Sequence, residues 1–264
     1  MSDAIWLPLF DEFADPRVAV DLAERAEAAG WDGFFVWDHI RWGDADRLVG
    51  DPWVTLAAIA GATRRIRLGP MVSPLPRYRP AAVVRQTVSL DLLSEGRLIV
   101  GAGLGADRFG GEYSRFGEDA DARRHAASTD ETLAILRAAW AGTPVRHAGE
   151  HHTVDDVRFL PTPYGGRQIP VWIAGMSTAG APRRRAARHD GFVPVNVPSP
   201  DAFAEMVGAH DHPPAFDFVA TIGMRDDGLA YQAAGATWIL REIEPELGLP
   251  AIAEFVDDGP GRAG

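Results

Sequence analysis

The sequence predicts an α/β protein in which eight parallel strands close into a (β/α)8 barrel with the helices outside. Short, almost continuously apolar runs alternate with amphipathic runs of helical period, as expected for strands that are buried on both faces. This alternation of strand and helix occurs eight times along the chain. The 264 residues also match the roughly 250 that one barrel of this kind uses.

The first two strand–helix units have clear helix starts. Asp15-Pro16 and Asp51-Pro52 each combine a capping carboxylate with a proline at the first helical position. The helix after Asp15 carries an apolar stripe and ends at Gly30. The strands of this half are expected at 5–10, 34–37, 66–72 and 97–103, and a further helix at 80–93.

The second half is interrupted before the pattern resumes. Residues 104–165 are expected to form an insertion with a polar loop, a helix through Leu133 and Trp140, and a small hairpin at 145–154. The last four strands are expected at 171–174, 192–195, 216–222 and 237–240, each followed by a helix-compatible segment. We expect one domain over residues 1–256, followed by a flexible tail over 257–264.

An open, doubly wound sheet is the alternative fold. Its dinucleotide-binding form needs a G-x-G-x-x-G turn after the first strand and an acidic residue after the next. Residues 101–106, GAGLGA, lack the final glycine and follow the fourth strand, and no suitably placed acidic residue follows. The closed barrel is therefore favoured.

The composition narrows the possible partners. A formal net charge of -11 argues against a nucleic acid or an anionic membrane, which need a basic patch, and the one basic cluster, 183–185, reads as a solvated helix face. Without cysteine, a disulfide framework, a thiolate metal site and a thiol nucleophile are all impossible. The chain shows no leader pattern and no apolar run near 18 residues, so we expect a cytoplasmic protein without membrane contact.

Two common catalytic patterns are missing. The adjacent histidines 151 and 152 lie in the expected hairpin, and no H-x-H or H-E-x-x-H spacing occurs, so we expect no metal site. A G-x-S-x-G nucleophile motif is also absent, which disfavours a serine hydrolase.

The carboxyl ends of the strands carry the active site in a barrel of this kind. Asp38 and His39 follow the second strand, where a histidine beside a carboxylate acts as a general acid or base, or only satisfies loop backbone groups. Trp42 lies in the polar loop that follows and is placed to form a wall for a planar ligand. Other polar groups after strands are Asp11, Glu12, Ser73, Arg77, Asn196, Arg241 and Glu242.

Small residues follow the fifth strand. Gly175, Met176 and Ser177 open a helix there and are suited either to hold a phosphate or simply to cap the helix. The tryptophans within strands, Trp37, Trp172 and Trp238, are expected to serve packing.

Several stretches in order resemble the bacterial luciferase-like family of flavin and deazaflavin oxidoreductases. They are "AERAEAAGWDGFFVWDHI" at 23–40, residues 51–105, "TLAILRAAWAG" at 132–142, residues 169–196, and "AAGATWILRE" at 233–242. The resemblance spans about Leu7 to Glu244 and implies a luciferase-like TIM barrel, in agreement with the count of strands.

The resemblance also implies roles for particular residues. Asp38 and His39 match an Asp-His pair whose histidine faces the reacting part of the cofactor ring, and Trp42 lies close to a substrate-side tryptophan, one residue nearer than usual. The strand-three bulge that supports the ring, often with a non-prolyl cis peptide, corresponds to Met71, Val72 and Ser73. The strand-four segment beside the ring corresponds to Gly101, Gly103 and Gly105, and the phosphate turn to Gly175, Met176 and Ser177.

Three departures from the family pattern qualify these roles. Ala106 stands where some deazaflavin-dependent sugar-phosphate dehydrogenases carry a glutamate acid, which disfavours such a substrate. The segment between strands six and eight is short, so the C-terminal part of the barrel is reduced. The phosphate turn also lacks the arginine or tryptophan of close relatives. An open pocket and weak cofactor binding are the expected consequences.

The leading hypothesis is an oxidoreductase or monooxygenase that uses a reduced flavin-type cofactor on a small organic substrate. Coenzyme F420 is favoured over FMN because the Trp-Asp-His-x-x-Trp run resembles the deazaflavin subgroup. A homodimer and a separate cofactor reductase are the expected partners. A cofactor-poor family member acting as a binding or partner protein is the alternative, and a cofactor-free barrel lyase using Asp38 and His39 is a third hypothesis.

Overall fold

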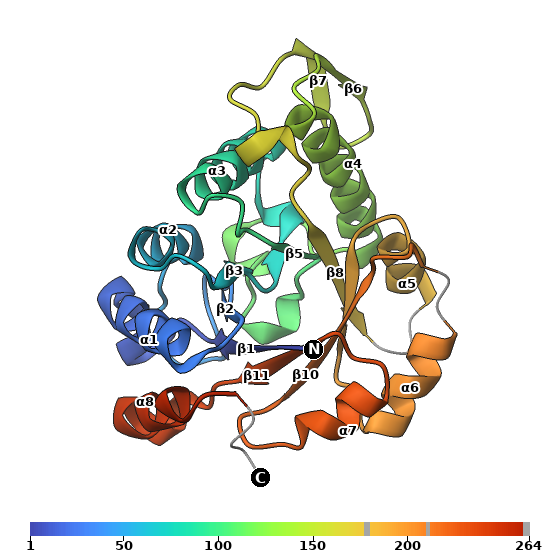
Figure 1. Ribbon diagram of the computed structural model, residues 1–264. Coiled ribbons are helices and arrows are strands. Elements are labelled where there is room, and N and C mark those ends of the chain that lie inside the picture. Colours follow the sequence, from blue (N-terminus) through green and yellow to red (C-terminus); the bar gives the residue numbers. More distant parts are fainter. Residues whose placement is uncertain (177–179, 210–211, 261–264) are drawn as a thin grey trace.

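The computed structural model describes residues 1–176, 180–209 and 212–260. Parallel strands surround a common axis and the helices lie outside them (Figure 1). The barrel strands are β1 Ser2–Leu7, β2 Gly33–Val36, β3 Arg67–Pro70, β4 Ser73–Pro74, β5 Val100–Gly103, β8 Val171–Met176, β9 Gly191–Val195, β10 Asp217–Gly223 and β11 Trp238–Glu242. The helices are α1 Pro16–Ala29, α2 Pro52–Ala62, α3 Pro80–Leu93, α4 Ala122–Trp140, α5 Gly180–Ala186, α6 Pro200–Gly208, α7 Gly228–Ala233 and α8 Gly248–Asp258.

The hydrogen-bonded order of the sheet is β3-β2-β1-β11-β10-β9-β8-β5-β4. The two ends of this series meet, because Leu68 forms a parallel bridge with Leu98 and the N–H of Ile99 donates to the Leu68 carbonyl at 2.9 Å. Because β3 and β4 together form the third strand of the barrel, the nine strands fill eight strand positions around the ring. The predicted (β/α)8 barrel is confirmed.

The third strand differs from the single run predicted at 66–72. It is divided into β3 and β4 by Met71 and Val72, which are joined by a cis peptide bond. Pro70 and Pro74 flank this break, and a proline offers no N–H to a neighbouring strand. The hydrogen-bond pairing therefore changes at this point: β3 pairs with β2, and β4 pairs with β5. The change produces the bulge that the family resemblance implied.

The helix starts agree with the capping signals in the sequence. The Asp15 carboxylate accepts the N–H of Arg17 at 3.0 Å, and the Asp51 carboxylate accepts that of Val54 at 2.8 Å. The helix α1 ends at Gly30, whose φ of 91° lies in the left-handed region that glycine adopts without strain.

The side chains inside the barrel form their own cluster, separate from the larger core between strands and helices. Alternation along each strand sends one set inward and the other outward; in β1, Trp6 points inward whereas Ile5 and Leu7 face the helices. The fully or mostly buried interior residues are Ala4, Trp6, Phe35, Met71, Ile99, Trp172, Val193, Val219 and Leu240. The interior is therefore filled, and ligands must bind at an end of the barrel.

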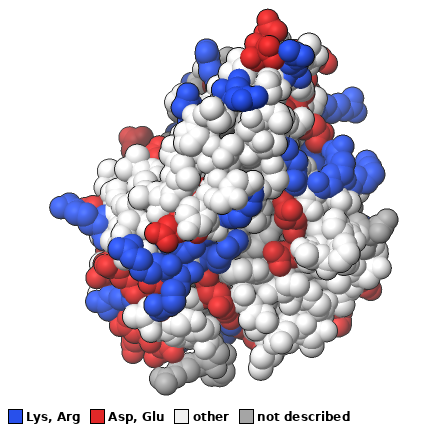
Figure 2. All heavy atoms as spheres, turned by 45° about the horizontal axis from the view of Figure 1, so that its top comes forward, with Lys and Arg blue, Asp and Glu red and all other residues white. Residues whose placement is uncertain are grey.

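The segment between β5 and β8 holds the additional elements. The helix α4 lies beside α3, and beyond it the hairpin of β6 Val145–Ala148 and β7 Thr153–Val157 projects from the body of the molecule (Figure 1). Figure 2 shows basic and acidic side chains interspersed on one face rather than gathered by sign. None of the described helices is long and apolar enough to cross a membrane.

Candidate active site at the carboxyl end of the barrel

Asp38 lies at the carboxyl end of β2 and is almost fully buried. Its carboxylate accepts hydrogen bonds from the Ser73 hydroxyl at 2.5 Å, from the Tyr78 hydroxyl at 2.9 Å and from the Arg77 guanidinium. Ser73 and Arg77 were among the polar strand-end residues noted in the sequence. These contacts hold the loop after β2 against the loop after β4.

His39 makes its polar contact with a residue from a different loop. Its Nδ1 lies 3.0 Å from Oε2 of Glu112, and the other Glu112 oxygen accepts the N–H of Ile40 at 2.8 Å and the Arg77 guanidinium at 2.7 Å. Glu112 is 1% exposed, whereas the His39 side chain is 18% exposed. With Glu112 ionised, Nδ1 carries the proton toward it, and Nε2 remains for a ligand.

The electrostatics of this network follow from burial and from one shared cation. Burial raises the pKa of Asp38, although the charge of Arg77 and the Ser73 and Tyr78 hydrogen bonds favour its ionised form. Burial also opposes ionisation of Glu112, but the hydrogen bond and charge of His39, with the charge of Arg77, bring its pKa below the usual value. Arg77 is itself desolvated, yet the two carboxylates raise its pKa. It therefore serves both acids as a fixed cation.

An aromatic cluster surrounds His39. Its ring centroid lies 4.7 Å from that of Trp42, and Trp42 stacks on Phe109 at 5.0 Å with an interplanar angle of 12°. Phe10 and Trp37 also contact Trp42, with centroids 5.6 Å and 5.3 Å from it. Trp42 therefore packs beside His39, and its role as a wall for a ligand stays a prediction.

The predicted ring-support residues lie next to one another. Met71 and Ser73 are buried and Val72 is half-buried, in the bulge between β3 and β4. A Cβ added at Gly101 would lie 2.5 Å from the Met71 sulfur, and one at Gly103 would lie 2.8 Å from Val72 Cγ1. The glycines of β5 therefore allow the bulge to approach the strand.

The third glycine of this segment serves the following loop. Gly105 has a φ of 69°, and an added Cβ would lie 2.5 Å from the Tyr113 hydroxyl. Tyr113 in turn donates to the Leu104 carbonyl at 2.8 Å. Because Tyr113 adjoins Glu112, this contact fixes the loop that delivers the carboxylate to His39.

The predicted phosphate turn is described in part. Gly175 is half-buried and an added Cβ would lie 2.3 Å from Pro182, so this glycine is required for the close packing of α5 on β8. Met176 is 42% exposed at the end of β8. Ser177 lies outside the described residues.

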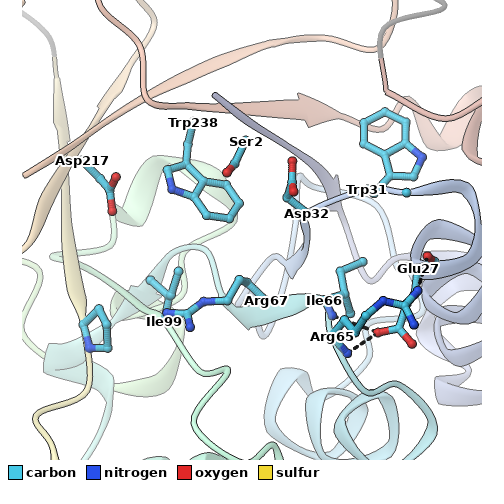
Figure 3. Close-up of a pocket in the computed structure, with 12 residues that line it drawn as sticks. Ser2, Glu27, Trp31, Asp32, Arg65, Ile66, Arg67, Ile99, Asp217 and Trp238 are labelled. Carbon is cyan, nitrogen blue, oxygen red and sulfur yellow. Dashed lines mark hydrogen bonds between the residues drawn. The ribbon is translucent and has the colours of Figure 1, made fainter.

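A pocket of about 460 Å³ opens at the opposite, amino end of the barrel (Figure 3). Its charged groups bond to the fold itself: Glu27 accepts the N–H groups of Arg65 and Ile66 at 2.5 Å and 2.9 Å, and Asp217 accepts the Thr237 hydroxyl at 2.9 Å. The Asp32 carboxylate accepts the N–H of Asp3. These contacts hold strand starts and helix ends together, so the charged groups of this pocket serve the fold.

Glu112 and Tyr78 are the members of the network that the sequence did not reveal. Glu112 lies 73 residues after His39, within the insertion. No spacing rule connects a carboxylate in a long loop to a histidine on another strand. Only the Gly-rich character of the segment after β5, which indicates a loop at the carboxyl end, pointed to this region.

Comparison with known proteins places the chain in a family. Residues 8–212 match the family described as luciferase-like monooxygenase. The F420-dependent glucose-6-phosphate dehydrogenase of Nocardia farcinica is 32% identical over 189 residues, which are 67% of this chain and 53% of that protein. The chain thus spans about half the length of this curated relative.

Two solved structures share the fold. The coenzyme F420-dependent tetrahydromethanopterin reductase of Methanopyrus kandleri superposes with a TM-score of 0.78 at 15% identity, covering 97% of both chains. The oxygenating constituent of 3,6-diketocamphane monooxygenase of Pseudomonas putida, in complex with FMN, gives a TM-score of 0.66 at 20% identity, covering 84% of this chain and 67% of that one. With its closed barrel and a family match over most of its length, the chain belongs to the luciferase-like monooxygenase family.

Proposed function

We propose that this protein is an oxidoreductase that uses a reduced flavin-type cofactor, F420 in preference to FMN, on a small organic substrate. The observation that carries the proposal is His39, held by Glu112 through Nδ1 and enclosed by aromatic rings at the carboxyl end of the barrel. The names of the relatives support the choice of cofactor, since the curated relative and one structural neighbour are F420-dependent. We take residues 1–256 as the unit that carries this function.

The residues at the barrel mouth fit a planar cofactor. Gly101 and Gly103 have no side chain to obstruct the bulge at Met71 and Val72, and this bulge would support one face of the ring. Gly105, Gly175 and Met176 would line the remainder of the cofactor; Ser177, the third residue of the predicted phosphate site, lies outside the described residues. When bound, such a group supplies the redox chemistry, which is hydride transfer for F420 and oxygen insertion for FMN.

His39 is the group that we propose to handle the proton. The Glu112 carboxylate fixes the Nδ1–H tautomer, so Nε2 is the atom that gives or accepts a proton at the substrate oxygen or stabilises negative charge there. Asp38 acts through Arg77 and the backbone, since it bonds to Ser73, Arg77 and Tyr78 rather than to the His39 ring. Trp42 and the rings around it exclude water from this side.

Glucose 6-phosphate is not the substrate that we propose, although it appears in the name of the curated relative. Ala106, which is half-buried after β5, offers no acid at the position where sugar-phosphate dehydrogenases of the family carry one. A small uncharged alcohol or carbonyl compound suits the aromatic wall better. Turnover of glucose 6-phosphate at a rate comparable with that of a small alcohol would contradict this choice.

A homodimer is the assembly that we propose. The helices α2 and α3 present Val54, Leu92 and Leu93, which are 61%, 36% and 50% exposed, beside a groove of about 390 Å³. Light scattering of the purified protein tests this assembly, and a charge at Val54 should shift it toward monomer. We also propose that a separate reductase supplies the reduced cofactor. The location that we propose is cytoplasmic, and cell fractionation tests it.

Titration with each cofactor tests the function most directly. We expect bound cofactor to quench tryptophan fluorescence, since the cluster around His39 contains two indoles. The Kd measured in this way should be lower for F420 than for FMN. Binding of neither cofactor below roughly 1 mM would contradict the oxidoreductase proposal and favour a binding or partner protein. Turnover of a substrate without any cofactor would instead favour the lyase alternative.

A further inference from the structure

Trp37 carries a buried hydrogen-bond donor with no acceptor among the described residues. Three other buried indole N–H groups are partnered: Trp6 donates to the Met71 carbonyl at 2.5 Å, Trp31 to the Val256 carbonyl at 2.8 Å, and Trp140 to the Thr87 hydroxyl at 3.1 Å. Buried polar groups in proteins are normally hydrogen-bonded. The Trp37 donor is therefore available to an acceptor that the described part of the chain does not provide.

The position of Trp37 places this donor at the barrel mouth. The residue follows β2 directly, and strand alternation directs Phe35 and Trp37 inward and Val36 outward. Its ring centroid lies 5.2 Å from that of Trp6, 5.7 Å from that of His39 and 5.3 Å from that of Trp42. The sequence had suggested packing alone for Trp37, but the side chain is half-buried at the top of the interior cluster.

Trp53 shows that an unpartnered indole is not sufficient to define a site. Its Nε1 is also buried without an acceptor in the described part of the chain. However, Trp53 lies on α2, outside the barrel, with its nearest recorded ring contact to Tyr78 at 6.5 Å. It therefore provides a matched control for Trp37.

We propose that the Trp37 indole N–H donates to a ring carbonyl oxygen of the bound flavin-type cofactor. This inference rests on the proposed function. Trp37 packs on Trp6, which is itself bonded to the Met71 carbonyl, so the donor lies beside the bulge that would support the ring. FMN and F420 both carry carbonyl acceptors on a pyrimidine-type ring. Because Nε1 is buried in this structure, neighbouring side chains must move for the carbonyl to reach it.

Trp37→Phe and Trp53→Phe test this proposal, because each removes one unpartnered N–H. We expect Trp37→Phe to raise the Kd of F420 and FMN roughly tenfold, as loss of one hydrogen bond to a ligand does, and Trp53→Phe to leave both unchanged. Binding is followed through the absorbance of the cofactor, which the loss of a tryptophan does not alter.

Vibrational spectra separate this hydrogen bond from a merely structural role. The carbonyl stretching bands of bound FMN should shift to higher frequency in Trp37→Phe relative to wild type and to Trp53→Phe. If Trp37→Phe does not fold, benzothienylalanine at position 37 replaces only the N–H by sulfur and carries the same expectations.

The outcomes also separate this inference from the proposed function. Wild-type affinity and unchanged carbonyl bands in the Trp37 variants would overturn the role of Trp37 while leaving the oxidoreductase proposal intact. Failure of the wild-type protein to bind either cofactor would overturn both.

Discussion

The two ends of the barrel use buried charge in different ways. At the amino end, Arg97 donates to the carbonyls of Ala60, Thr63, Ile66 and Ser94, and Glu27 accepts three backbone N–H groups. At the carboxyl end, Arg77 joins Asp38 to Glu112, and Glu112 in turn holds His39. Charged groups that hydrogen-bond to the backbone stabilise the fold, whereas charged groups that hydrogen-bond to one another fix the orientation of a side chain for chemistry.

Removal of His39 should have the largest effect, and this effect should fall mainly on turnover. We expect His39→Ala to lower kcat by roughly 1000-fold, within the range found for loss of a general acid or base. The substitution also removes the hydrogen bond to the buried Glu112, so urea unfolding should show a loss of roughly 1–3 kcal/mol in a protein that still folds. His151→Ala on the hairpin is the control. Unchanged kcat in His39→Ala would remove His39 from the mechanism.

Removal of Arg97 should show the opposite behaviour at the amino end. Arg97→Ala leaves several buried carbonyl oxygens without a donor, which should lower the free energy of unfolding by about 3 kcal/mol. The kcat of the folded fraction should stay the same. Arg85→Ala is the control, since Arg85 is exposed and donates a long hydrogen bond of 3.4 Å to the Leu160 carbonyl. Equal destabilisation by both substitutions would contradict the contrast between the two ends.

Glu112→Gln should reduce turnover without preventing cofactor binding. The amide keeps the shape but not the charge that fixes the His39 tautomer, so we expect kcat to fall roughly 10- to 100-fold, as for other carboxylates that orient a histidine. The ¹⁵N shifts of the His39 ring should report loss of the single Nδ1–H tautomer. Glu118→Gln, at an exposed acid of the same loop, should leave both measurements unchanged.

The smallest effect is expected for the pH dependence of stability that arises from His189 at the amino end. Burial, reinforced by the charge of Arg137, lowers the pKa of His189 from 6.5 to about 4. The unfolded chain therefore binds the proton more readily, and stability should fall as pH decreases from 6.5 toward 4, by on the order of 2 kcal/mol. His189→Gln should flatten this dependence in denaturant unfolding. A dependence that persists in the variant would assign it to another group.

The sequence by itself determined the framework of the protein. Apolar periodicity, proline-led caps and the order of strands and helices are local properties, and they predicted the barrel, the starts of α1 and α2, and the position of Asp38 and His39 at a strand end. The division of the third strand followed in part from Pro70 and Pro74, although the periodicity alone suggested one continuous strand.

Only the tertiary structure decided which groups meet at that end. Arg77 reaches Asp38 across 39 positions of sequence and Glu112 reaches His39 across 73. These pairs exist because closure of the barrel brings separate loops over one mouth. The unpartnered donor of Trp37 is likewise a property of its surroundings. The hydrophobic periodicity of a sequence indicates which side of a helix or strand is buried. It carries no information about which polar groups from other loops will face that element.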